Sequence, residues 1–81
     1  MAGYWEIWDL QSRNMLATEE TERAALAVVR EIVGEGSAYS DLMLLFDDPD
    51  IDVDDLPPGV IGDELARRAE AAGADPVRRT A

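Results

Sequence analysis

The apolar positions near the start of the chain have the period of a β-strand. Tyr4-Trp5-Glu6-Ile7-Trp8 is rich in aromatic and β-branched residues, which is typical of a strand. Successive side chains of a strand point to opposite faces, so Trp5 and Ile7 share one face. Tyr4, Glu6 and Trp8 share the other face. Large apolar groups lie on both, and we therefore expect both faces to be partly covered.

A turn and a second strand follow. Residues 9–14 include Asp, Ser and Asn, whose side chains bond to nearby backbone in turns. Residues 15–18 can return as a strand, so the pattern predicts an antiparallel hairpin. Arg13 falls where a tight turn favours a positive φ, a conformation that is unfavourable for a residue with a side chain.

The clearest helical pattern runs over residues 21–33. Thr21 suits the N-cap position, although Thr18 is an alternative cap because acidic residues follow it as well. Gly34 and Gly36 predict the end of the helix, since glycine readily takes the left-handed conformation found there. The apolar stripe at helical spacing comprises Ala25, Leu26, Val29, Ile32 and Val33.

The next segments predict a strand and a loop. The continuous apolar run over residues 42–46 suits a central strand with both faces buried, although its periodicity also permits a helical turn. Residues 47–59 are expected to form a loop, because Pro57 and Pro58 can neither join a central strand nor continue a helix. Residues 60–61 add a brief strand or fill the core.

A second helix is predicted over residues 63–72, with Gly73 as a natural stop. Its apolar face is expected to comprise Ile61, Leu65, Ala69 and Ala72. Together these elements predict a single α+β domain over residues 1–73, in the order ββαβα. We expect a small antiparallel sheet with two helices mainly on one face, followed by a flexible C-terminal tail over residues 74–81.

The composition restricts the chemistry that the chain can perform. Its 81 residues suffice for one small domain, and a hydrophobic content of 47% is normal for a folded one. The chain contains no cysteine, histidine or lysine. This excludes disulfides and zinc sites built from cysteine or histidine, and it leaves every serine without a histidine or lysine to activate it. We expect no enzyme activity and no cofactor. A general-acid role for Glu6 is a minor alternative to an exposed strand position or an ion pair across the sheet.

The charge narrows the range of partners. The formal net charge is −11, from 18 acidic and 7 basic residues. Such a chain repels nucleic-acid phosphates and anionic membrane surfaces, so we expect neither as a direct partner, whereas basic proteins are favoured in encounter.

The N-terminus lacks the basic segment of a signal peptide, and no apolar run approaches the roughly 20 residues that span a bilayer. The cytoplasm is the expected compartment.

Much of the acidity is concentrated in one short segment. Within it, Asp50, Asp52 and Asp54 have the alternating spacing of a calcium-binding EF-hand loop. However, Asp55 and Ile61 stand where that loop requires a glycine and a bidentate glutamate. A solvated acidic loop that contacts a basic partner is the better interpretation. The aspartates of the segment are Asp47, Asp48, Asp50, Asp52, Asp54 and Asp55.

Tyr4 and Trp8 are further candidate contacts for a partner, because exposed aromatic residues commonly anchor interfaces. The leading hypothesis is a non-catalytic protein-interaction module that self-associates as a homodimer. The alternative is an acidic inhibitor, such as an antitoxin or a nucleic-acid mimic, that covers a basic surface of an enzyme with the aspartate segment. Arg67 and Arg68, together with Arg78 and Arg79, make the C-terminal part of the chain locally basic. We expect them to be attracted to the acidic loop of the same chain or of a second copy.

Three short motifs of the chain are similar to motifs found together in other proteins. They are Trp8-Asp9 followed by Ser12-Arg13-Asn14, then Ala25-Leu26-x-x-Val29-Arg30, and last Gly62-Asp63-Glu64-Leu65-Ala66. Together they resemble a group of short, uncharacterised bacterial proteins that open with a Trp-Asp hairpin. In that group the hairpin turn is typically Ser-Gly-Asn, so Arg13 stands where a glycine is usual. The resemblance spans residues 4–72 and implies the same order of elements, but no function, because the group has no assigned activity.

Overall fold

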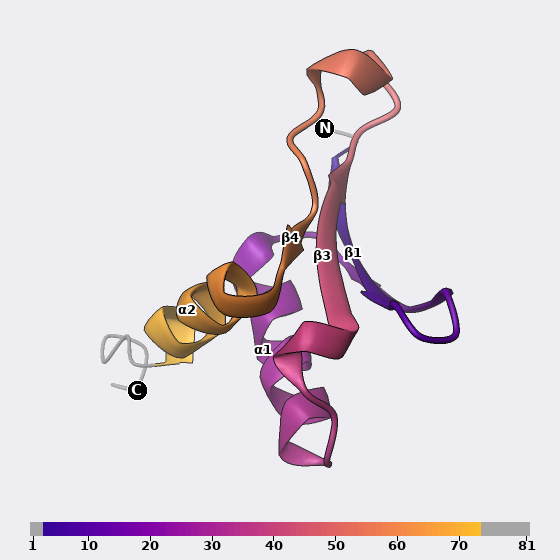
Figure 1. The fold of residues 1–81 in the computed structure, drawn as a ribbon. Helices are drawn as coiled ribbons and strands as arrows, with labels where there is room; N and C mark the ends of the chain where they lie inside the picture. The colour runs from indigo at the N-terminus through magenta and orange to yellow at the C-terminus, as the bar shows by residue number, and fades with distance from the viewer. Residues whose placement is uncertain (1–2, 74–81) are drawn as a thin grey trace.

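The computed structural model describes residues 3–73 as strands and helices around one core (Figure 1). The tail predicted over residues 74–81 lies outside the described residues. The elements are β1 (Tyr4–Asp9), β2 (Asn14–Glu19), α1 (Glu22–Gly34), β3 (Leu42–Asp47), β4 (Val60–Ile61) and α2 (Gly62–Gly73), with single 3-10 turns at Tyr39–Asp41 and Val53–Asp55.

The strands form one antiparallel sheet in the order β2-β1-β3-β4. Both helices lie on the same face of this sheet, to the left of β1 and β3 in Figure 1. The predicted α+β class and order of elements are confirmed, and residues 60–61 form the brief fourth strand. The run over residues 42–46 forms a central strand and not a helical turn, because it pairs with β1 on one side and β4 on the other.

The hydrophobic core lies between the sheet and the two helices. Ile7 and Leu44 are register partners at its centre, and both are completely buried. Trp5 stacks on Phe46 next to them, with ring centroids 4.9 Å apart and a tilted geometry typical of aromatic pairs. The buried residues are Ile7, Ala25, Leu26, Val29, Leu42, Leu44, Val60, Leu65 and Ala69.

The β1–β2 hairpin closes as its sequence predicts. The Ser12 side chain and backbone N–H donate to the Asp9 carboxylate, and these bonds lower the pKa of Asp9 below its ordinary value. Arg13 takes the predicted positive φ, at 63°. The β1–β2 ladder also has an irregularity between Ile7 and Trp8. It is a β-bulge, in which two residues of one strand oppose a single residue of the other.

The first helix begins and ends at the predicted positions. The Thr21 hydroxyl accepts a hydrogen bond of 3.1 Å from the Ala24 N–H, which satisfies one of the free donors at the helix start. The alternative cap, Thr18, lies inside β2 instead. Gly36 follows the helix with a φ of +124°, which accounts for a glycine at this position.

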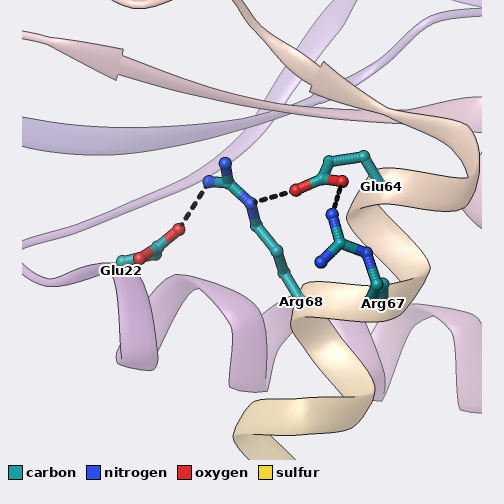
Figure 2. A network of polar contacts seen from close by, with 4 residues as sticks. All are labelled: Glu22, Glu64, Arg67 and Arg68. Carbon is teal, nitrogen blue, oxygen red and sulfur yellow. Dashed lines mark hydrogen bonds and ion pairs between the residues drawn. The ribbon is translucent and has the colours of Figure 1, made fainter.

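A cluster of ion pairs joins α2 to the start of α1 (Figure 2). Arg68 Nε donates to Glu64 at 2.9 Å, and Arg68 Nη1 donates to Glu22 at 2.9 Å. Arg67 also donates to Glu64. The expectation that Arg67 and Arg68 are attracted to the acidic loop of this chain is therefore wrong. Arg78 and Arg79 lie outside the described residues. Nearby helix carboxylates at i−3 and i−4 are closer partners than residues in a separate loop.

Candidate functional site

The second face of the sheet carries the candidate site, because neither helix covers it (Figure 1). We call it the open face. The alternation of side chains along each strand assigns residues to it. They are Tyr4, Glu6 and Trp8 of β1, Met15, Leu16 and Thr18 of β2, Met43, Leu45 and Asp47 of β3, and Ile61 of β4.

Three apolar side chains of the open face are about half exposed to solvent. Met15 is 48% exposed, Leu16 46% and Ile61 53%. The bulge explains why two of these side chains, those of Met15 and Leu16, are exposed. Because Met15 and Leu16 both lie opposite Trp8, neither reaches the core on the helix side, whereas Ala17 does. Met15 and Ile61 lie on opposite edge strands, and Trp8 and Met43 connect them in one row across the sheet. A continuous apolar patch of this kind marks a site that binds other molecules.

A polar cluster lies within this apolar surface. Glu6 is only 9% exposed and accepts a hydrogen bond of 2.9 Å from the Trp8 indole N–H. The Tyr4 hydroxyl donates to the Asp47 carboxylate at 3.0 Å. That bond raises the pKa of the Tyr4 phenol above 10.0, and the negative charge of Glu6 adds to the shift. The carboxylates of Glu6 and Asp47 thus both act on the same hydroxyl group.

The loop from residue 48 to residue 59 forms an arm that extends beyond the end of the sheet, at the top of Figure 1. Asp48 is half-buried at its base, where its carboxylate accepts the Asp50 N–H at 2.9 Å. The other aspartates of the arm, Asp50, Asp52, Asp54 and Asp55, are exposed. One 3-10 turn is its regular structure, so these carboxylates do not lie in a row on a strand or a long helix.

The structure therefore divides the predicted contact residues into two groups. Tyr4, Trp8 and Asp47 come together on the open face, while the remaining aspartates belong to the arm or its base. For Glu6, between them, the sequence predicts an exposed position or an ion pair, with a general acid as the minor alternative. It is buried, and its hydrogen-bond partner is Trp8 and not an arginine. Its place beside Tyr4 and Trp8 follows from the period of two along β1, which is the signal that could have identified it.

The open face can form hydrogen bonds and apolar contacts at once. Its carboxylates accept hydrogen bonds, and the half-buried Trp8 ring lies beside them. A shallow hollow of about 520 Å³ opens at one margin, where Tyr4 and Thr18 meet Glu20 and Ala24 at the start of α1. Within residues 3–73, no three acidic residues are grouped closely enough to hold a metal ion.

Two further observations bear on the site. None of the helices within residues 3–73 is long and apolar enough to cross a membrane. Comparisons with protein-family models, with curated proteins and with solved structures found no match. The resemblance to the short bacterial proteins therefore stays a prediction.

Proposed function

We propose that this protein is a non-catalytic interaction module and that the open face is its binding surface for another protein. The observation that carries the proposal is the exposure of the apolar side chains there, about half of each for Met15, Leu16 and Ile61. Covering them would remove apolar surface from water, at roughly 25 cal/mol per Å². The resemblance to short bacterial proteins adds an order of elements and no activity.

The sequence predicts two molecules that could bind the open face: a second copy of the chain, or a different protein with a basic surface. Both require the same apolar contacts, so one substitution tests the face itself. Leu16→Asp places a charge on the open face at a residue that is already 46% exposed, and the fold should tolerate it. Ser37→Asp adds the same charge at an exposed position after α1 and is the matched control.

The test combines affinity capture from the native cells with sedimentation of the purified protein. We expect at least one protein, or a second copy, to be retained by the wild type and by Ser37→Asp and lost by Leu16→Asp. Circular dichroism should show that all three proteins are folded. The proposal is wrong if Leu16→Asp retains the same molecules as the other two, or if the wild type retains none and sediments as a monomer.

A further inference from the structure

The buried carboxylate of Glu6 restricts what can cover the open face. A carboxylate offers about four lone-pair positions for hydrogen bonds. The Trp8 indole N–H occupies one of those of Glu6 at 2.9 Å, and the Tyr4 hydroxyl lies beside a second one. An occupant made only of apolar atoms would displace water from the others. An unpaired charge that loses its water is among the most costly groups to bury. The occupant must therefore supply hydrogen-bond donors at this point.

The described part of the chain has no cation on the open face to satisfy Glu6 or Asp47. Arg13 lies in the hairpin turn, at the end of β1 opposite to the Asp47 end. Every other arginine within residues 3–73 belongs to a helix, on the far side of the sheet. The acidic arm continues from Asp47 and adds more negative charge at that end. The face is therefore apolar and anionic.

We propose that the open face binds a partner protein that inserts an arginine side chain against Glu6 and Asp47, surrounded by aliphatic or aromatic side chains. The inference rests on the proposed function and specifies the partner's chemistry. A guanidinium has five N–H donors in a planar fork that matches carboxylates. A guanidinium also stacks on tryptophan rings, and the half-buried Trp8 lies beside Glu6.

A second copy of the chain fits this chemistry less well. Glu6 lies near the middle of β1, so pairing two open faces would bring the Glu6 carboxylates of both copies close together. Arg13 lies at the hairpin end of the strand, away from this central contact. Like charges in a shared apolar site repel and oppose association. The two occupants therefore predict opposite effects of neutralising Glu6. Glu6→Gln weakens the binding of an arginine-bearing partner, but it strengthens the association of two copies.

The probe is a phage-displayed library of random 16-residue peptides, selected against the full-length wild-type chain at pH 7.5. Three variants serve as parallel targets. Glu6→Gln removes the charge but keeps an oxygen to accept the Trp8 bond, and Asp47→Asn is the second test should Glu6→Gln fail to fold. Glu70→Gln removes the same charge from an exposed position on α2 and is the matched control.

We expect the selected peptides to carry an arginine flanked by apolar residues. Their affinity should fall about tenfold or more on Glu6→Gln and remain unchanged on Glu70→Gln. The inference is overturned by selected peptides without basic residues, or by peptides that bind Glu6→Gln and Asp47→Asn as tightly as they bind the wild type. So does a wild-type chain that dimerises in sedimentation and dimerises more tightly as Glu6→Gln. Two other outcomes would instead contradict the proposed function itself. In the first, the selected peptides bind Leu16→Asp as tightly as they bind the wild type. In the second, the wild-type chain selects no peptide and does not self-associate.

Discussion

The two faces of the sheet should respond very differently to the same substitution. Leu44→Ala and Leu16→Ala remove the same atoms from two strands of one sheet. Leu44 is completely buried on the helix-covered face, whereas Leu16 is 46% exposed on the open face. The comparison therefore measures directly whether the chain itself covers the open face.

The expected costs follow from the burial of each side chain. Leucine loses three carbon atoms, at about 0.8 kcal/mol for each buried one, so the transfer term for Leu44→Ala is about 2.4 kcal/mol. The cavity left in the core raises the cost to about 3–4 kcal/mol. For Leu16, just over half buried, the same calculation gives about 1.3 kcal/mol, and water can fill the space. The two substitutions should thus differ by about 2 kcal/mol, a large part of the ~4–12 kcal/mol stability of such a domain.

Urea unfolding at low protein concentration measures both costs, with tryptophan fluorescence and circular dichroism as independent probes. The m-value should be unchanged in both variants, so that shifts of the midpoint report stability. Equal costs for Leu16→Ala and Leu44→Ala at every concentration would refute the assignment of an open face. A cost for Leu16→Ala that grows with protein concentration would show that copies associate through it.

Three further predictions concern the frame that holds the open face. Arg68 and Arg67 lower the pKa of Glu64 below its usual 4.5. The ion pairs of Glu64 therefore stabilise the fold above pH 4.5, and this stabilisation is lost as pH falls through the lowered pKa. Thermal melts should therefore show Glu64→Gln less stable than the wild type at pH 7 and equal to it near pH 2; a gap that persists at low pH would contradict the ion-pair explanation. Arg13→Gly should raise the stability by up to about 1 kcal/mol in urea, because glycine takes a φ of 63° without strain, and a loss of stability would show that the Arg13 side chain makes a favourable contact. Thr21→Ala should cost about 1 kcal/mol by removing the N-cap of α1, whereas Thr18→Ala, at the rejected cap position, should cost clearly less in the same assay.

The order of the elements was predictable because its signals are local. The stripe of α1, the Thr21 cap and the glycine at position 36 each depend on residues within one or two helical turns. The positive φ of Arg13 likewise follows from the length of the hairpin turn. Such short-range preferences all agree with the observed fold, and sequences in which local and global preferences agree are the most readily interpreted.

The open face was harder to predict because it depends on strand pairing. The bulge beside Trp8 places Met15 and Leu16 on the same side of the sheet, and a bulge is set by the register between two strands. Ile61 was expected on the apolar face of the second helix but is 53% exposed. The reason is Gly62, whose φ of 56° redirects the chain between β4 and α2, so that Ile61 no longer shares the helical period of Leu65.

The acidity of the chain and its exposed apolar face make physical sense together. An apolar face of this kind would by itself favour unspecific association of copies. A net charge of −11 opposes such association between identical chains, and Glu6 and Asp47 oppose it most strongly because they lie within the face. Screening at physiological salt limits charge repulsion to roughly 8 Å, so the carboxylates at the point of contact matter more than distant ones. The same two carboxylates favour a partner that brings an arginine, and on the proposed function they therefore both keep copies apart and select the partner.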